Sequence, residues 1–221
     1  LIAPALAAGN TVVVKASEQA PAAMLKFAEL IHEAGFPPGV VNMITGFGEP
    51  CGRVLTSHPK VARVAFTGGP ETARHIIKNT SGNFAHVSLE LGGKSPILVF
   101  DDADLEGAVN GIIAGNYGAS GQSCVAGSRV FIQSSIYDQV LEKIKERAAQ
   151  IVIGDPLAEA TQIGPLATTA QLERAERVVA NSVEQGARLV CGGKRPDHMN
   201  TGWYFEPTLL ACPDQSIESV Q

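Results

Sequence analysis

Short β-branched runs alternate with helix-length stretches along the N-terminal part of the chain, and this alternation restricts the possible folds more than any other feature. The runs at 11–15, 40–44 and 61–66 are rich in valine and isoleucine or end in phenylalanine, as buried strands do. Between the first two, residues 17–34 repeat apolar side chains at helical spacing. Strands that alternate with helices pair in parallel through right-handed crossovers. The sequence therefore predicts an α/β fold, with further helices at 1–8, 52–57 and 70–79 and a further strand at 86–91.

The pattern changes after Gly92-Gly93, and this predicts two domains, at 1–93 and 94–221. Downstream of the glycines, longer amphipathic stretches separate the apolar runs. Asp101 or Asp102 is the expected cap of the first of these helices. We expect helices at 104–117, 134–151 and 168–185, and strands at 97–100, 128–132, 188–191 and 204–210.

Charge and composition favour a cytoplasmic metabolic protein. The net charge of −5 gives no electrostatic support for binding nucleic acid or an anionic membrane. No apolar run reaches the roughly 18 residues of a membrane-spanning helix. The four cysteines include no C-x-x-C pair and the five histidines lack metal-ligand spacing, so we expect neither a disulfide framework nor a metal site. Neither end carries a capping signal, which predicts an internal fragment of a longer protein.

Cys124 is the first candidate for chemistry, in the run Ala119-Ser-Gly-Gln-Ser-Cys-Val-Ala-Gly127. Free cysteine has a pKa of about 8.5, so a catalytic cysteine needs access and nearby hydrogen-bond donors. The small neighbours leave room for a substrate, and a backbone N–H at a turn could face a developing oxyanion. Taken alone, however, packing of a small side chain is the default interpretation.

Glu90, in Leu89-Glu-Leu-Gly-Gly-Lys94, is the second candidate. A carboxylate among apolar neighbours is costly unless it is paired, neutral or functional. Near a nucleophile, it could accept a proton from water. The alternative is an edge-strand glutamate that faces solvent.

Three loops at the carboxyl ends of predicted strands could approach a ligand. In Thr67-Gly-Gly-Pro-Glu71 a strand meets a helix, where free N–H groups favour phosphate oxygens. Gly46-Phe-Gly48 allows close backbone approach, and in Lys15-Ala-Ser-Glu18 the charged groups could bind ribose hydroxyls. None is a G-x-G-x-x-G motif. For each loop alone a plain turn, with Ser17 as a helix cap, is the simpler interpretation.

Taken in order, these runs resemble the NAD(P)-dependent aldehyde dehydrogenase superfamily. Their order and spacing cover essentially the whole chain. The matching runs are Gly9-Asn-Thr-Val-Val-Val-Lys15 with Glu18, Gly35-Phe-Pro-Pro-Gly-Val-Val-Asn42, Phe66-Thr-Gly68, Glu90-Leu-Gly-Gly-Lys94, Gly121-Gln-Ser-Cys124 and Glu206-Pro-Thr-Leu209.

The resemblance implies the C-terminal part of a Rossmann-like NAD-binding domain at 1–93, followed by most of an α/β catalytic domain at 94–221. Cys124 would attack an aldehyde carbon to give a thiohemiacetal and then a thioester, and Glu90 would activate the water that releases the acid. Tyr117 and Ser123 would line a substrate tunnel. The whole protein would be a homodimer or homotetramer.

NAD is the expected cofactor and NADP the alternative, because the carboxylate of Glu18 would repel a 2′-phosphate. Lys15 and Glu18 would hold the adenosine ribose, and Gly68 with the following helix N-terminus would face the pyrophosphate. The implied cofactor residues are Lys15, Ser17, Glu18, Gly48, Phe66, Thr67, Gly68, Gly69, Leu91 and Gly92.

The chain departs from the family pattern in three places. Gly69 stands where many members have serine, which removes a hydroxyl donor to the phosphate. The family's oxyanion-hole asparagine and its Glu-x-Phe-Gly-Pro segment fall outside Leu1 and Gln221. Because one oxyanion donor is worth about 10²–10³ in rate, we expect the isolated fragment to be inactive.

Two alternatives stay open. A CoA-acylating semialdehyde dehydrogenase would share the thioester chemistry, but that branch lacks a glutamate at the position of Glu90. A non-catalytic relative with a binding or structural role would need neither Glu90 nor Cys124.

Overall fold

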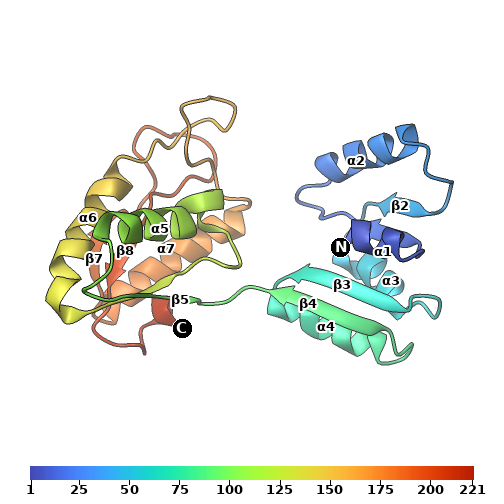
Figure 1. Cartoon of the computed structure of the whole chain (residues 1–221), viewed down its shortest axis with the longest axis horizontal. Helices are drawn as coiled ribbons and strands as arrows, with labels where there is room; N and C mark the ends of the chain where they lie inside the picture. The colour runs from blue at the N-terminus through green and yellow to red at the C-terminus, as the bar shows by residue number, and fades with distance from the viewer. The chain divides into compact units, whose positions relative to one another are not determined.

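The computed structural model describes residues 1–221 and divides them into two compact units, Leu1–Leu91 and Gly92–Gln221. Both contain helices and strands (Figure 1), so the fold is α/β, as the alternation predicts.

The first unit is built on two parallel strand pairs, each with a helix between its strands. Parallel neighbours cannot be joined by a tight turn, so a helix crosses over between them. In Figure 1, α4 lies against the β3–β4 pair, with which it is in contact. The strands are β1 (Val12–Lys15), β2 (Val41–Ile44), β3 (Arg63–Gly68) and β4 (His86–Leu91), and the helices are α1 (Ile2–Ala7), α2 (Ala22–Glu33), α3 (Arg53–Ser57) and α4 (Pro70–Thr80).

The registers bring the carboxyl ends of paired strands level with one another. Lys15 lies opposite Ile44 at the end of the β1–β2 pair. In the other pair Gly68 lies opposite Leu91. The loops that follow these ends are therefore neighbours within each pair, which is where open α/β sheets bind ligands.

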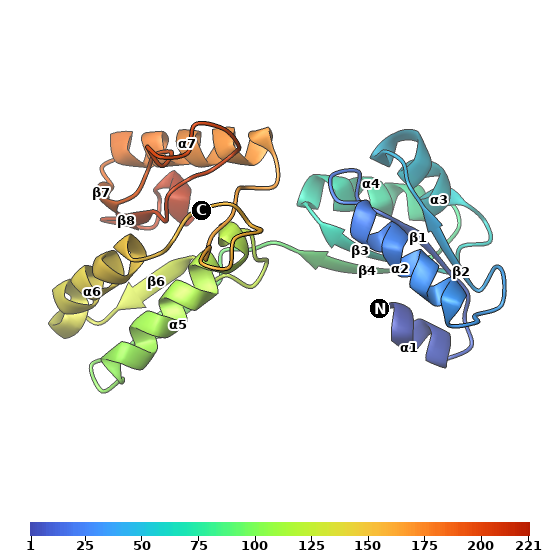
Figure 2. The same cartoon turned by 90° about the horizontal axis from the view of Figure 1, so that it is seen from above.

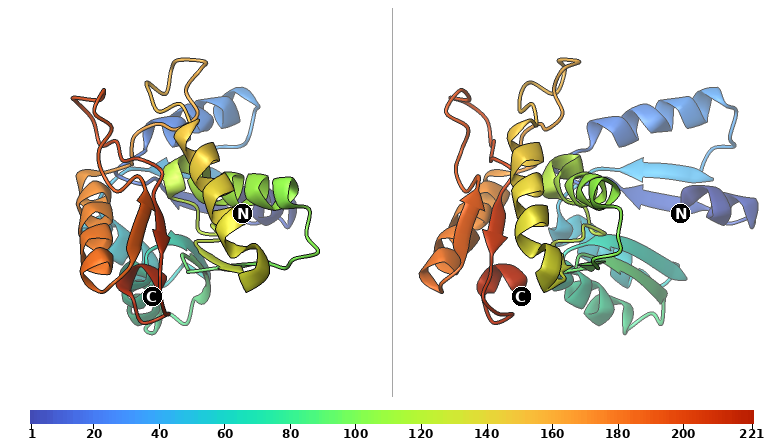
Figure 3. Two further views of the ribbon diagram at one scale, coloured as in Figure 1. Left: turned by 90° about the vertical axis from the view of Figure 1, so that its left-hand side faces the viewer. Right: turned by 60° about the vertical axis from the view of Figure 1, so that its left-hand side comes forward.

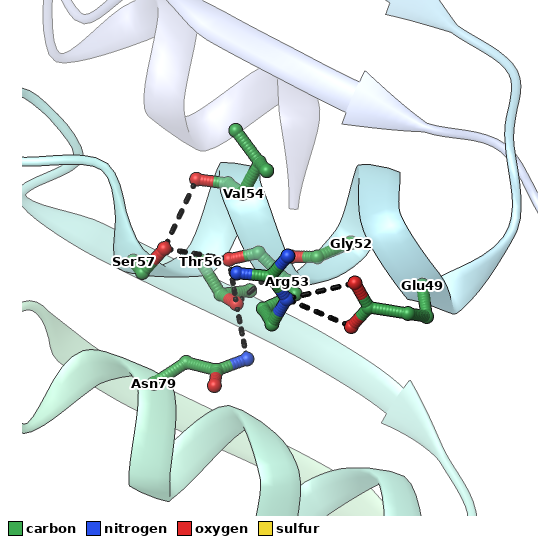
Figure 4. Close-up of polar contacts among 7 residues, drawn as sticks. All are labelled: Glu49, Gly52, Arg53, Val54, Thr56, Ser57 and Asn79. Carbon is green, nitrogen blue, oxygen red and sulfur yellow. Dashed lines mark hydrogen bonds and ion pairs between the residues drawn. The ribbon is translucent and has the colours of Figure 1, made fainter.

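Side-chain amides fasten α3 to α4 in the first unit (Figure 4). Asn79 on α4 donates to the hydroxyl of Thr56 at 3.0 Å, and Thr56 is buried. Asn83, beyond the end of α4, donates to the carbonyls of Thr56 and His58 at 3.0 and 2.9 Å. Glu49, in the turn before α3, forms an ion pair at 2.8 Å with Arg53, the first residue of α3. These bonds set the position of the short helix α3, which follows the second strand.

The second unit contains one parallel and one antiparallel strand pair. In both views of Figure 3, α6 lies between α5 and β7, and it contacts both. Figure 2 shows α7 alongside the β7–β8 pair. The strands are β5 (Pro96–Val99), β6 (Arg129–Ile132), β7 (Arg188–Cys191) and β8 (Leu209–Ala211), and the helices are α5 (Leu105–Tyr117), α6 (Tyr137–Ala149) and α7 (Thr169–Glu184). Short helical turns lie at Gly48–Gly52, Gly118–Gly121, Ser134–Ile136 and Glu218–Val220.

The core of the second unit joins one strand and two helices. Val99 on β5 packs with Val109 and Ile112 on α5 and with Val140 and Ile144 on α6. Residues three or four apart share one face of a helix, so both helices turn an apolar stripe toward β5. Fully burying a side chain of this size contributes about 1.5–3 kcal/mol.

Three predicted boundaries are corrected by the structure. Asp104, not Asp101 or Asp102, caps α5, because its carboxylate accepts the N–H groups of Glu106 and Gly107. The helix expected at 17–34 begins only at Ala22, after Pro21. The strand expected at 204–210 is confined to Leu209–Ala211, since Pro207 has no N–H to donate to a ladder.

Candidate active site

Lys15 joins the loops that follow β1 and β2. Its ammonium donates to the carbonyl of Gly46 at 2.7 Å, to that of Ala16 at 2.8 Å and to the carboxylate of Glu18 at 3.3 Å. A backbone hydrogen bond at residue 18 and the Lys15 ammonium lower the pKa of Glu18. An ionised carboxylate and an ammonium therefore stand together at the end of this strand pair.

The backbone conformation and the neighbouring side chain at position 46 require a glycine. Its φ of +146° is one that side chains rarely adopt, and an added Cβ would lie 2.8 Å from the Cβ of Cys51. The chain therefore turns back on itself immediately beside Lys15. Gly48 begins the following turn and has open space around it.

The turn at Gly48–Gly52 forms one wall of an apolar pocket of about 380 Å³. Its lining is Ile44, Pro50, Cys51, Val54, Leu55 and His58. Sequence reasoning missed these residues, although apolar residues such as Val54 and Leu55, shortly after a glycine loop at a strand end, are a signal for such a pocket. Ile44 is the register partner of Lys15, so the pocket adjoins the charged pair.

The second strand pair places Glu90 at its carboxyl end. Glu90 lies opposite Thr67, one residue before the pair Gly68 and Leu91. Its side chain is exposed and makes no hydrogen bond or ion pair within the chain. The carboxylate is therefore available to solvent or to a bound group.

Gly68 and Gly69 lead directly into α4. A Cβ at Gly68 would lie 2.5 Å from the ring of Phe66, so the backbone there passes close to that ring. Gly69 is the N-cap of α4 and no side chain caps its first turn. Pro70 has no N–H, and the other N–H groups of the first turn of α4 remain free to bind an anion, as at other helix N-termini.

Ser17 is exposed, and its hydroxyl accepts the N–H of Gln19 at 3.2 Å. This local turn replaces the helix cap that the sequence suggested for Ser17. Gly92 opens the second unit, immediately after β4.

Cys124 is a free, exposed thiol in the second unit. Ser123, just before it, is half-buried, and its carbonyl accepts the N–H of Ala126 at 3.2 Å. Gly127 is buried against Ile97 on β5, where any Cβ would overlap that side chain. The thiol therefore lies on a tight loop anchored just before β6.

Tyr117 ends α5, and its hydroxyl donates to the carbonyl of Thr208 at 3.2 Å. Burial raises the pKa of Tyr117. The hydroxyl is thus engaged by the carbonyl of Thr208, just before β8.

Within the first unit the structure gathers Lys15, Glu18 and Gly48 around one pair of strand ends, and Phe66, Thr67, Gly68, Gly69, Glu90 and Leu91 around the other. Tyr117, Ser123 and Cys124 belong to the second unit. No group of three or more His, Cys, Asp or Glu side chains is placed to hold a metal ion. None of the helices combines the length and the apolar character needed to cross a membrane.

Comparison with known proteins gives one consistent result. The model of the aldehyde dehydrogenase family matches residues 1–221. The (Z)-2-((N-methylformamido)methylene)-5-hydroxybutyrolactone dehydrogenase of Acinetobacter baylyi is 57% identical over 211 residues, which cover 96% of this chain and 43% of that protein. The betaine aldehyde dehydrogenase of Rhizobium leguminosarum is 46% identical, over 95% of this chain and 43% of that protein.

Among solved structures, the betaine aldehyde dehydrogenase of Staphylococcus aureus in complex with NAD+ has a TM-score of 0.95 and 41% identity, covering 100% of this chain and 44% of that one. An NADP-dependent enzyme of E. coli also has a TM-score of 0.95, with 40% identity over 99% of this chain and 45% of that one. The chain thus spans less than half the length of the relatives it matches. Because the family model matches every residue, the chain belongs to the aldehyde dehydrogenase family.

Proposed function

We propose that the protein oxidises an aldehyde to a carboxylic acid with NAD(P)+, through a thioester on Cys124. The observation that carries this proposal is that a chain of this family presents both an exposed thiol at Cys124 and an exposed, unpaired carboxylate at Glu90. A nucleophile and a base for water are the two groups that such a reaction needs from the protein.

The first unit offers groups that fit a dinucleotide. Glu18 can accept hydrogen bonds from ribose hydroxyls, and the ammonium of Lys15, whose three N–H groups bond Gly46, Ala16 and Glu18, holds that carboxylate in place. The apolar pocket next to Ile44 suits a flat base. The uncapped first turn of α4 suits the pyrophosphate. The ionised carboxylate of Glu18 favours NAD+ over NADP+, because it would repel a 2′-phosphate.

The proposed chemistry proceeds on the sulfur of Cys124. The thiolate adds to the aldehyde carbon, a C–S bond forms, and the carbonyl oxygen takes up the negative charge. Bound NAD(P)+ supplies the acceptor for the hydride that this carbon loses, and a thioester remains. Glu90 then accepts a proton as water attacks the thioester carbon. The C–S bond breaks, the carboxylic acid leaves, and the thiolate returns.

Glu90 distinguishes hydrolysis from transfer to coenzyme A. A coenzyme A thiol would attack the thioester in place of water, and no glutamate would be needed at this position. The unpaired carboxylate of Glu90 therefore favours hydrolysis.

Burst kinetics of a Glu90→Gln variant of the whole protein test this assignment. We expect about one NADH per subunit in the first turnover, followed by a steady rate reduced roughly 10²–10⁴-fold. Glu176→Gln, an exposed glutamate on α7, is the control and should keep the wild-type steady rate. A Glu90→Gln enzyme with an undiminished steady rate would refute the role of Glu90.

The thiol is tested by labelling. Iodoacetamide should modify Cys124 stoichiometrically, aldehyde should protect it, and Cys124→Ala should abolish NADH formation. Cys212→Ala is the control and should keep NADH formation, because the thiol of Cys212 contacts the hydroxyl of Ser219 at 3.6 Å and has no part in the proposed reaction. If Cys124 is inert, the non-catalytic alternative is favoured.

For the substrate, we propose a small aldehyde and no nucleic acid or membrane partner. A panel for the whole protein should include betaine aldehyde and the hydroxybutyrolactone named for the Acinetobacter relative. We further propose that the protein is cytoplasmic and that it assembles as a homodimer or homotetramer. Light scattering of the whole protein can test the assembly.

A further inference from the structure

The backbone is left-handed at residues 119–121, which end two positions before Ser123-Cys124. Ala119 has φ 52° and ψ 36°, Ser120 has φ 54° and ψ 37°, and Gly121 has φ 71°. For residues other than glycine this conformation costs roughly 1–2 kcal/mol each. Two such residues in succession persist only if other contacts hold them.

Two long-range hydrogen bonds supply such contacts. The hydroxyl of Ser120 donates to the carbonyl of Gly164 at 3.1 Å. The side-chain oxygen of Gln122 accepts the N–H of Ala167 at 3.1 Å. Both bonds join the turn to residues 164–167, more than forty positions along the chain.

Residues 164–167 are themselves held firmly. The N–H of Leu166 donates to the carbonyl of Trp203 at 2.9 Å. Ile163 is buried, and it bonds the backbone of Val152 and Gly154 at 3.1 Å each. The segment therefore provides a fixed support for the turn.

A cavity lies beside the turn and its support. It has a volume of about 530 Å³ and lies between Ala119 and Ser120 on one wall and Pro156 and residues 164–167 on another. Two side-chain hydrogen bonds, one donated by Ser120 and one accepted by Gln122, join the turn to its support beside this cavity.

We propose that Ser120 and Gln122 are positioning residues that orient Cys124 through their bonds to residues 164–167. The inference rests on the proposed role of Cys124 as the nucleophile. Attack on a carbonyl needs the sulfur in a narrow range of positions, and a displacement of about 1 Å can cost about 10² in rate. Neither side chain has to touch the substrate for this effect.

Hydrogen exchange tests the hydrogen bond between Ala167 and Gln122 without an activity assay. In Gln122→Met, the amide of Ala167 loses its acceptor and should exchange roughly tenfold faster or more. Gln185→Met is a matched control, because the Gln185 side-chain oxygen accepts the N–H of Glu218 at 2.7 Å, away from the turn. Gln185→Met should speed exchange at Glu218 and leave Ala167 unchanged. Unchanged exchange at Ala167 in Gln122→Met would overturn the proposal.

Kinetics of the whole protein test the consequence. Gln122→Met should lower kcat about 10–100-fold and leave the KM for NAD+ within about twofold. Ser120→Ala should act in the same direction, and the double variant should cost less than the product of the two, because both act through one segment. Gln185→Met should keep the wild-type kcat.

The outcomes separate the two hypotheses. Faster exchange at Ala167 with an unchanged kcat would overturn the positioning role and leave the proposed function standing. A wild-type protein that oxidises no aldehyde would refute the proposed function, and the exchange data would still decide whether the restraint exists. If Gln122→Met fails to fold, Ser120→Ala decides the matter through its kcat and the exchange of residues 118–127.

Discussion

At the residue scale, Lys15 shows how one side chain can join the loops that follow two paired strands. Its ammonium bonds a carbonyl 31 positions away, and its stem lies 3.9 Å from where a Cβ of Gly52 would be. Glu18 shares this ammonium and remains ionised at neutral pH, since its pKa is lowered. Under the proposed function, the choice between NAD+ and NADP+ would depend on this single carboxylate.

Glu18→Gln removes that charge and should change cofactor preference. We expect the ratio of kcat/KM for NADP+ to that for NAD+ to rise roughly tenfold, because the repulsion of a 2′-phosphate is lost. Glu29→Gln is the matched control, since Lys26 and Glu29 form an ion pair of the same spacing on α2. An unaltered ratio would mean that Glu18 does not face the ribose.

Tyr117 predicts an alkaline loss of stability. Its pKa is raised by burial in the folded state, and the unfolded value is about 10. The unfolded state therefore releases the proton first, so stability is intact below about pH 10 and falls as the pH rises above it. At pH 11 the wild type should lose about 1.4 kcal/mol that Tyr117→Phe keeps. Urea unfolding at pH 9 and 11 measures the difference, with Tyr137→Phe as the control; equal losses in all three would contradict the prediction.

At the element scale, α5 shows that neighbouring aspartates can have different tasks. Asp104 caps the helix, whereas Asp101 accepts a hydrogen bond from Gln133 at 2.6 Å and one from Ser135 at 3.2 Å. Asp101 thus ties the end of β5 to the turn after β6. The side chain of Asp102 neither caps α5 nor accepts these hydrogen bonds.

Asp104→Ala should therefore destabilise the second unit by about 1 kcal/mol, and Asp104→Asn should restore most of it. Asp102→Ala is the control, and its effect should stay within about 0.5 kcal/mol. Thermal or urea unfolding measures all three. A larger loss for Asp102→Ala than for Asp104→Ala would reverse the assignment of the cap.

At the scale of the whole molecule, the two units differ in how much they bury. The second unit holds the cluster around Val99 and Ile144, whereas the buried side chains of the first are few, and Ile76 is the largest of them. The sole tryptophan, Trp203, belongs to the second unit. Its fluorescence therefore follows that unit during unfolding.

Ile144→Ala should weaken the second unit selectively. We expect a loss of about 2–5 kcal/mol in the transition that Trp203 reports, because a buried cavity is created. Hydrogen exchange in β3 and β4 should not change, since their unit has its own buried side chains. Ile77→Ala, on the exposed side of α4, is the control with an expected effect within about 0.5 kcal/mol. Equal loss of protection in β3 and β4 would show that the chain unfolds as one.

The sequence by itself determined the type and order of most elements, because periodicity and turn residues are local signals. It also singled out Cys124 and Glu90, whose neighbours are unusual within a few positions, and their roles stay a proposal. It could not place the cap of α5, since Asp101 is engaged by residues 32 and 34 positions away. The apolar pocket, the partners of Lys15 and the restraint on Ser120 and Gln122 were likewise decided only by tertiary structure. Each joins groups that are distant along the chain, and a local pattern carries no information about which distant groups the fold brings together.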